Sequence, residues 1–347
     1  MAVVKKEFGK NSKGEQAYFY EITNAAGMKA IVTDFGATLH SLYVPDKDGV
    51  MRDVVWGYDS VTEYEIDNGP FFGATVGRIA NRTGGAVVTI DGIDYKMEAN
   101  ERTNCLHSGS ECYHVRMWNA EILENAVKFF ILSPDGDQGL PGNFDISVTY
   151  ALTDDNGLKI TYDGVSDKDT YVSMTNHSYF NLDGEKSDSI LEHELWLNAD
   201  AFTRVNNEMI STGEILDVTG TAMDFRTAKT LGRDINKDEE ALNIGSGYDH
   251  NFVLNVHAAD EAIAKVVSDE SGIVMEIFTD CPGMQIYTGN FLCDKPGKGG
   301  RIYPNRSAVA FETQQFPDAM HHDNFPSPLV RAGETFFTET VYKFSVK

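Results

Sequence analysis

The segment Thr175–Leu182, which reads TNHSYFNL, places His177 among neutral polar and aromatic side chains. Its β-branched and aromatic residues predict a strand. Because an imidazole titrates near neutral pH, His177 could donate or accept a proton beside an uncharged polar ligand. A lone histidine on a strand is more often structural, so a catalytic interpretation needs further groups. We expect neutral partners for such a ligand from four neighbours: Thr175, Asn176, Tyr179 and Asn181.

Three residues in other segments could act together with His177. Arg82 ends the segment GRIANR, and its planar guanidinium could bind two hydroxyls or one carboxylate. His107 precedes a Ser-Gly turn in NCLHSG and could therefore project from a loop. Glu312 ends an apolar stretch in AFETQQ, where apolar neighbours would raise its pKa and strengthen it as a base. Two histidines, one glutamate and one arginine suit acid and base catalysis on a neutral polyol.

The same side chains could instead hold a metal ion or cleave a glycosidic bond. Two ligands at HxH, HxD or HxE spacing on one strand would favour a metal, and no strand histidine shows that spacing. His321-His322-Asp323 comes nearest, but its loop position after Pro317 favours a solvated cluster. A glycosidase needs a facing pair of carboxylates, which 53 acidic residues leave open. The sequence shows neither a serine nucleophile elbow, nor a Walker loop, nor a dinucleotide-binding glycine motif.

We expect strands to carry most of these residues. Short segments rich in Val, Ile, Thr, Phe and Tyr alternate with turn signals, as in the hairpin Val87–Ile90, Asp91-Gly92, Ile93–Met97. Further predicted strands are Val127–Leu132, Ile146–Leu152, Leu158–Tyr162, Tyr171–Met174, Leu195–Asn198, Phe252–Val256, Ala264–Val267, Val274–Phe278, Met284–Tyr287, Ala308–Glu312 and Phe336–Ser345. Ala228–Leu242 could hold one or two helical turns. Because strands follow one another without alternating helices, the pattern predicts an all-β fold, an antiparallel sandwich or barrel.

Length and composition limit the class of protein. The 347 residues show no linker, so we expect a single domain over residues 1–347. We find no apolar run long enough to cross a bilayer and no secretory signal peptide, and we therefore expect cytoplasmic residence. Four cysteines without CxxC spacing suggest free thiols in a reducing compartment: Cys105, Cys112, Cys281 and Cys293.

The formal net charge is -24 at pH 7. Such a charge repels phosphate backbones and anionic lipid surfaces, so it argues against nucleic-acid and membrane partners. It also weighs against a phosphorylated substrate, which normally needs a cluster of basic residues. The expected partner is a neutral small molecule.

An ordered series of motifs runs through the chain. GRIANR is followed by LHSG, TNHSYFNL, MDFR at Met223–Arg226, YDHNFVL at Tyr248–Leu254, FETQ and PDA. With DFGATL and DGDQGLPG, this series resembles the aldose 1-epimerase family from about Asp34 to Val346. The resemblance implies a large antiparallel β-supersandwich of the galactose mutarotase type, with a sugar cleft on one face. It also implies interconversion of the α and β anomers of free aldoses such as galactose or glucose, without a metal or other cofactor.

The resemblance also implies roles for individual residues. Glu312 would be the general base that takes the proton from the C1 hydroxyl, and His177 the general acid that protonates the ring oxygen. His107 would hydrogen-bond near the anomeric centre. We expect the acid and the base to stand on opposite sides of the C1–O5 unit, resting as imidazolium and carboxylate, with a bell-shaped pH profile. Four further residues match positions that contact or orient substrate hydroxyls: Arg82, Asn81, Asp249 and Gln285.

Some positions depart from the family pattern. Ser108 stands where the family usually has a second glycine, and Glu111-Cys112-Tyr113 replaces a smaller, glycine-containing segment. His321 and His322 replace neutral residues of many relatives and would touch the cleft edge or only solvent.

Two other functions stay open at this point. A catalytically silent sugar-binding protein is disfavoured by the presence of both Glu312 and His177, and a hexose-phosphate epimerase is disfavoured by the lack of a basic cluster. The sequence leaves open the preferred aldose and whether the chain is a monomer or a homodimer.

Overall fold

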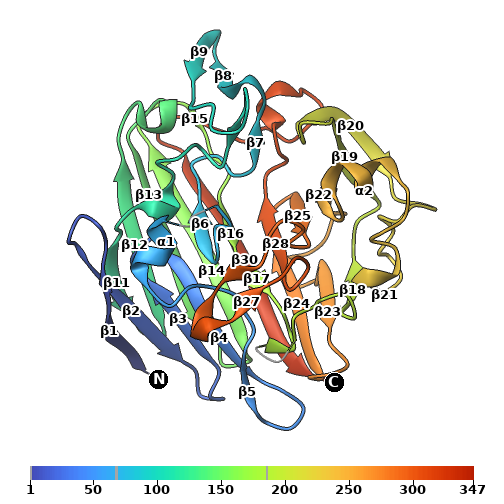
Figure 1. The fold of residues 1–347 in the computed structure, drawn as a ribbon. Coiled ribbons are helices and arrows are strands. Elements are labelled where there is room, and N and C mark those ends of the chain that lie inside the picture. The colour runs from blue at the N-terminus through green and yellow to red at the C-terminus, as the bar shows by residue number, and fades with distance from the viewer. Residues whose placement is uncertain (1, 67–68, 185–186) are drawn as a thin grey trace.

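Antiparallel strands dominate the computed structural model, which describes residues 2–66, 69–184 and 187–347 (Figure 1). The largest sheet has nine strands, and all its neighbouring strands are antiparallel. In spatial order they are β11 (Asn119–Leu123), β12 (Ala126–Ser133), β13 (Phe144–Leu152), β14 (Gly157–Ser166), β30 (Thr335–Val346), β24 (Ile273–Thr279), β23 (Ala264–Val267), β18 (Glu194–Leu197) and β21 (Lys229–Thr230).

Two smaller sheets accompany the large one. The first holds the N-terminal strands β1 (Ala2–Lys10), β2 (Gln16–Thr23), β3 (Lys29–Thr33), β4 (Thr38–Pro45) and β5 (Met51–Asp53). The second has the order β17 (Tyr179–Phe180), β28 (Val309–Gln314), β25 (Gly283–Tyr287), β22 (Asp249–Val253), β19 (Ala201–Val205) and β20 (Ser211–Asp217). Figure 1 shows β12 and β13 at the left of the molecule, β28 near its centre, and β25 and β22 to the right of β28.

Short strand pairs and two short helices complete the described part of the chain. The pairs are β6 (Ala74–Val76) with β16 (Thr175–His177), β7 (Arg82–Thr83) with β10 (Cys105–Leu106), β8 (Val87–Ile90) with β9 (Ile93–Lys96), β15 (Thr170–Tyr171) with β29 (Leu329–Val330), and β26 (Lys295–Pro296) with β27 (Ile302–Tyr303). The helices are α1 (Val61–Ile66) and α2 (Glu240–Gly245). Among the residues described, every helix is too short or too polar to cross a bilayer.

One apolar core joins the three sheets. Phe129 and Val148 come from the large sheet, Ile22 from the N-terminal sheet, and Ile286 and Phe311 from the third sheet, and all five are buried in the same cluster. Burying each such side chain stabilises the fold by roughly 1.5–3 kcal/mol. The core thus fixes β25 and β28 against the large sheet, so the opposite faces of these two strands are held in place for a ligand site.

The predicted all-β fold is confirmed. The hairpin forms at β8 and β9, where Asp91 (φ 49°) and Gly92 (φ 80°) take the left-handed values of a type I′ turn. The strand expected at Tyr171–Met174 is wrong beyond Tyr171, because Ser173 donates its N–H to Arg78 in an irregular crossing. The helical turns expected in Ala228–Leu242 are only partly present, as a 3₁₀ turn at Leu231–Arg233 and the start of α2.

Arg78 shows why the GRIANR and DGDQGLPG segments occur together. Its side chain is fully buried. One Nη atom donates to the Pro141 carbonyl (2.7 Å) and to the Thr170 hydroxyl (3.0 Å), and the other donates to the Ser133 hydroxyl (2.8 Å). Arg78 therefore ties the segment before Asn81 to the loop that follows β12, and its role is structural.

Candidate active site

Glu312 lies in the interior strand β28, on the face opposite the core. Because side chains alternate along a strand, Phe311 points into the core and Glu312 points away from it. Glu312 stands directly opposite Gln285 of β25, and Gln285 stands opposite Asn251 of β22. Residues opposite each other share a face of the sheet. Asp249 is on the same face, and its Oδ1 accepts a hydrogen bond from Gln285 Nε2 at 2.6 Å.

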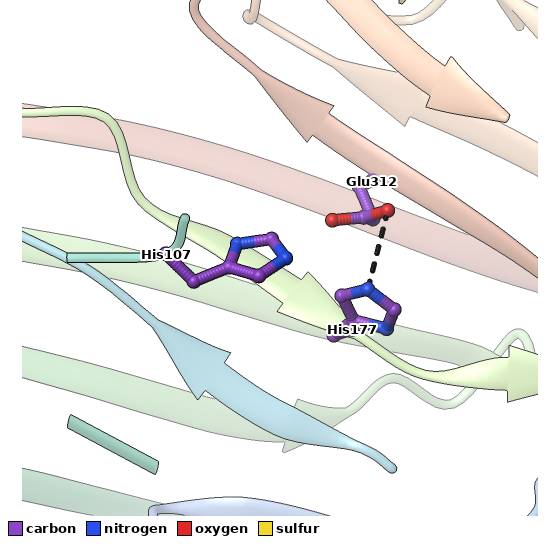
Figure 2. A group of neighbouring side chains, drawn as sticks. All are labelled: His107, His177 and Glu312. Atoms are coloured by element: carbon purple, nitrogen blue, oxygen red, sulfur yellow. Dashed lines mark ion pairs between the residues drawn. The ribbon is translucent and has the colours of Figure 1, made fainter. Parts of the chain in front are cut away.

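His177 ends the short strand β16, which pairs with β6. Its Nε2 atom lies 3.5 Å from Oε1 of Glu312, and the two side chains are only 7% and 3% exposed (Figure 2). The separation exceeds that of a charge-assisted hydrogen bond, about 2.7–2.9 Å, so the pair is not locked together. Within the described residues, neither Oε2 of Glu312 nor Nδ1 of His177 has a hydrogen-bond partner. Such buried unpaired atoms are unusual and favour a role in binding a ligand.

The expectation that acid and base stand on opposite sides of the sugar is wrong. A pyranose ring cannot fit between Nε2 of His177 and Oε1 of Glu312 at 3.5 Å. The two groups belong to one wall of the site. The C1 hydroxyl oxygen and the ring oxygen are bonded to the same carbon, so two neighbouring groups can reach both oxygens from one side.

Burial sets the protonation of this pair. It lowers the pKa of His177 to about 4. It raises the pKa of Glu312 well above the usual range, with the Asp249 charge acting in the same direction and Arg82 against it. Both shifts favour the neutral side chains and so weigh against the predicted resting pair of imidazolium and carboxylate. When the pair holds one proton, burial favours its residence on Glu312 over its residence on His177.

His107 comes from the loop after β10. Its backbone is left-handed (φ 52°), and its ring points toward His177 and Glu312 (Figure 2). The His107 and His177 rings meet edge to face, with centroids 5.4 Å apart, and Phe71 packs on His107 at 4.6 Å. Burial, and then the neighbouring His177, lower the pKa of His107 well below its usual value, so this imidazole is neutral.

Arg82 is held by a carboxylate that sequence reasoning missed. Its Nε and one Nη donate to the two oxygens of Glu101 at 2.6 and 2.9 Å. These bonds use two of its five N–H donors and orient the guanidinium. Nothing in the sequence distinguished Glu101 from the other acidic residues. The side-chain oxygen of Asn81 accepts the backbone N–H of Arg82 at 2.8 Å, which fixes the start of β7.

A cavity of about 510 Å³ connects these groups. Its volume lies within the range of small-molecule sites, roughly 300–1,000 Å³. All seven predicted site residues line it: His107, His177, Glu312, Asn81, Arg82, Asp249 and Gln285. Lining residues that sequence reasoning did not single out include Phe71, Glu101, Glu208, Met209, Tyr287 and Phe291. The cavity joins charged, amide and aromatic side chains, a combination that suits a polyhydroxylated ring.

Two expected ligand partners of the TNHSYFNL segment have structural roles instead. Asn176 donates to the Gly73 carbonyl (3.0 Å), and Asn181 donates to the Ser307 carbonyl (2.8 Å). Both bonds satisfy buried backbone oxygens. Of the four expected partners, Tyr179 alone lines the cavity.

The histidines and the segment whose contact with the cleft the sequence left open also lie away from the cavity. His321 bonds to Asp318 at 2.6 Å, and His322 bonds to the Ser211 carbonyl at 3.1 Å. The segment Glu111-Cys112-Tyr113, which departs from the family pattern, does not line the cavity either. Its last two residues are buried in the main core. These residues therefore support the fold around the site and do not line the cavity.

Known proteins have this fold and align with most of this chain. The family model for aldose 1-epimerase matches residues 18–343. A galactose mutarotase from Bos taurus is 40% identical over 320 residues, which cover 92% of each chain. An aldose 1-epimerase from Escherichia coli (strain K12) is 36% identical over 335 residues, covering 95% of this chain and 96% of that protein.

Solved structures agree. The aldose epimerase homologue from C. elegans superposes with a TM-score of 0.88 at 35% identity, covering 95% of this chain and 99% of that chain. The galactose 1-epimerase from Lactobacillus acidophilus NCFM has a TM-score of 0.87 at 25% identity, covering 100% and 99%. The match extends over nearly all of the chain, including every strand that contributes to the cavity, and the chain therefore belongs to the aldose 1-epimerase family.

Proposed function

We propose that this chain is a mutarotase, which interconverts the α and β anomers of free aldoses such as galactose or glucose. The observation that carries the proposal is the loose contact of two buried groups, His177 and Glu312, in the wall of a polar cavity. Relatives named galactose mutarotase and aldose 1-epimerase support it. The reaction moves protons and transfers no electrons, so it requires no redox cofactor.

Ring opening needs one proton removed and one supplied. In the form of the pair that carries its proton on His177, Glu312 takes the proton from the C1 hydroxyl as His177 gives its proton to the ring oxygen, O5. The C1–O5 bond breaks, its electron pair goes to O5, and C1 becomes an aldehyde carbon. Rotation about C1–C2 then exposes the other face of the aldehyde. Attack of the O5 hydroxyl on that face, with both proton transfers reversed, closes the ring to the other anomer.

The electrostatics of the pair favour this exchange. Each ring opening converts imidazolium plus carboxylate into imidazole plus carboxylic acid, with the total of one proton unchanged. Burial favours the second state, as the lowered pKa of His177 and the raised pKa of Glu312 indicate. Starting from imidazolium and carboxylate, burial therefore favours the proton transfers of ring opening and opposes those of ring closure. The 3.5 Å separation leaves His177 able to reach O5.

Four other lining residues are suited to hold the sugar hydroxyls. Arg82 offers donors from a guanidinium already oriented by Glu101, and Asp249 offers an acceptor oriented by Gln285. Asn81 adds an amide at the start of β7. Preorientation of this kind reduces the entropy lost on binding.

Polarimetry tests the proposal. Freshly dissolved α-D-galactose or α-D-glucose should reach rotational equilibrium faster with the protein than in buffer alone, and the Glu312→Gln variant should lose most of the acceleration. Equilibration at the buffer rate for both sugars and for a wider panel of aldoses would exclude the function. Calorimetric binding of sugar without acceleration would favour a silent sugar-binding protein instead.

We also propose that the whole chain acts as one catalytic domain, as a monomer or a homodimer, and resides in the cytoplasm. All four cysteines are free thiols, as predicted, and three of them are buried. Free thiols are typical of a reducing compartment.

A further inference from the structure

The tertiary structure reopens the question of a metal. His107, His177 and Glu312 each offer a ligand atom, and these atoms all lie within 4.8 Å of one another. Two histidines and one carboxylate form a common set of ligands for zinc and iron. The spacing of histidines along single strands gave no indication of such a set, because its members come from three separate segments. Whether the set can bind a metal depends on which nitrogen of His107 carries the proton.

The hydrogen bonds of His107 answer that question. The backbone N–H of Asn81 donates to Nδ1 of His107 at 3.0 Å. A backbone N–H can only donate, so Nδ1 must present its lone pair. In a neutral imidazole the single proton then resides on Nε2. The same rule, by which the partner of one nitrogen sets the state of the other, is general for histidines in active sites.

We propose that the Asn81 amide holds His107 as the tautomer protonated on Nε2, so that this imidazole is a neutral hydrogen-bond donor in the site and is not a metal ligand. Ligation through Nε2 would require a lone pair on that nitrogen and a proton on Nδ1. The Nδ1–H would then face the Asn81 N–H at 3.0 Å, and two donors would oppose each other. The tautomer itself does not depend on the proposed mutarotase function. Only the catalytic role of the Nε2–H donor rests on that function.

A clamp between two segments keeps this geometry. The His107 backbone N–H donates to the Asn81 carbonyl at 3.0 Å, so the two residues are joined twice. The Ser108 hydroxyl accepts the N–H of Ile79 (2.8 Å) and donates to the carbonyl of Ile79 (3.0 Å). His107 and Ser108 both have left-handed backbones, with φ of 52° and 65°. Such conformations are unfavourable for non-glycine residues and persist where surrounding contacts hold them.

Ser108 is thus a positioning residue for His107. A glycine at this position would tolerate the left-handed backbone but would lose both bonds to Ile79. A serine is less favourable than a glycine in this left-handed backbone conformation. Its hydroxyl, however, bonds directly to the GRIANR segment, which contains Asn81. Both His107 and Ser108 are buried, at 5% and 3% exposure, so water competes little for these bonds.

A neutral donor suits the proposed reaction. Negative charge develops on the C1 oxygen as its proton is withdrawn, and an Nε2–H pointing into the site would stabilise it. Removing one such donor from an active site typically costs about 10²–10³-fold in kcat. A neutral imidazole also leaves the single proton of the His177–Glu312 pair undisturbed, because it adds no positive charge beside them.

Histidine NMR on the unsubstituted 347-residue chain tests the tautomer directly. With ¹⁵N-labelled histidine, two-bond ¹⁵N–¹H correlations should show His107 protonated on Nε2 and unprotonated on Nδ1 throughout about pH 5–8. Contact with the Asn81 amide proton assigns the resonance without any variant. A proton on Nδ1, or an imidazolium in this range, overturns the proposal. The measurement needs no substrate, so its failure is separate from failure of the mutarotase function.

Three substitutions, two at His107 and one at Ser108, add a kinetic readout. Glutamine places an N–H₂ group near the Nε2 position, whereas asparagine places its side-chain amide near Nδ1. His107→Asn should lower kcat by about 10²–10³-fold, and His107→Gln should retain at least tenfold more activity, with KM little changed in both. Equal losses in the two variants contradict the donor role. Ser108→Ala should lower kcat more than it raises KM, and an unchanged kcat contradicts the positioning role.

Zinc alone provides the third test. Calorimetry with zinc ions should give the same affinity, within about twofold, for the wild type and for His107→Gln, because His107 is not a ligand. Specific binding of one zinc ion by the wild type that weakens tenfold or more in His107→Gln overturns the proposal. This arm also requires no sugar and no mutarotase activity.

Discussion

Nε2 of His177 and Oε1 of Glu312 lie 3.5 Å apart, although 134 residues separate them along the chain and they belong to different strand pairs. Both side chains are buried, and burial favours the uncharged form of each. At 3.5 Å the two groups do not form a tight ion pair. A proton can therefore pass to and from a sugar at both positions, and this property leads to most of the expectations that follow.

Glu312→Gln and His177→Asn should each lower kcat by about 10²–10⁴-fold, because each removes one of two proton-transfer groups. Polarimetric rates on α-D-galactose measure the effect, and circular dichroism checks that folding is intact. The double variant should lose little more than the worse single variant, since the two groups act as a unit. Strictly multiplicative losses would show that the two groups act independently.

The pH profile of kcat/KM should be a broad bell. The active pair holds one proton. On the acid side activity falls when His177 takes up a second proton, and its lowered pKa of about 4 places this limb below that of an ordinary histidine. On the alkaline side activity falls when Glu312 loses its proton, and its raised pKa moves this limb upward. His177→Asn should remove the acid limb, and an acid limb near pH 6.5, the ordinary histidine value, would contradict the lowered pKa.

The stability of the fold should depend on pH through Glu312. Its folded pKa is raised, so the stability it contributes is fully present below the unfolded value of 4.5 and is lost as pH rises toward the folded pKa. The loss is at most about 1.4 kcal/mol per pH unit for one group. Glu312→Gln should therefore be stabilised relative to the wild type at pH 8, and much less at pH 4. Urea unfolding at both pH values measures this, and an equal effect at both would contradict it.

Arg82→Ala should chiefly weaken substrate binding. It removes oriented donors and leaves Glu101 unpaired beside the cavity, so KM should rise by roughly 10- to 100-fold, with a smaller change in kcat. Arg204→Ala is the matched control, since Arg204 pairs with Glu214 and Glu240 on the surface and does not line the cavity. A similar KM for the two variants would exclude a binding role for Arg82.

Arg78→Met should destabilise the fold by about 3–5 kcal/mol without a direct effect on binding. The substitution leaves several buried acceptors unpaired, among them the Pro141 carbonyl and the Ser133 hydroxyl, each at a cost of roughly 1–3 kcal/mol. Denaturant titration measures the loss. Under conditions where the variant stays folded, KM should match that of the wild type, and a selective rise in KM would assign Arg78 to the site.

The strand pattern was largely predictable because it depends on neighbouring residues. Alternation in Ile146–Leu152 and a turn at Asp91-Gly92 are local features, and both predict the observed strands. The N-terminal sheet was not predicted, since its strands mix charged, aromatic and apolar residues, as in AVVKKEFGK of β1. The strand predicted at Tyr171–Met174 was wrong for the opposite reason. The segment has the composition of a strand, but two of its backbone N–H groups donate to the carbonyls of Arg78 and Pro328.

The candidate site was predictable in its members and not in its geometry. The motif series identified all seven lining residues that we expected, because residue type and order survive in sequence. The pairing of Arg82 with Glu101 could not be predicted from the sequence, since each side chain had many other possible partners of opposite charge.

An antiparallel all-β fold, the family, and the side chains available for proton transfer could all be predicted from the order of residues alone. Three features became visible only in the packed structure: His177 and Glu312 share one wall, burial favours the neutral form of each, and the Asn81 amide donates to Nδ1 of His107. The physical reason is that composition and alternation act over a few residues. The protonation of the site residues and the distances between them depend on burial and on contacts between distant segments. Both exist only after the sheets have packed.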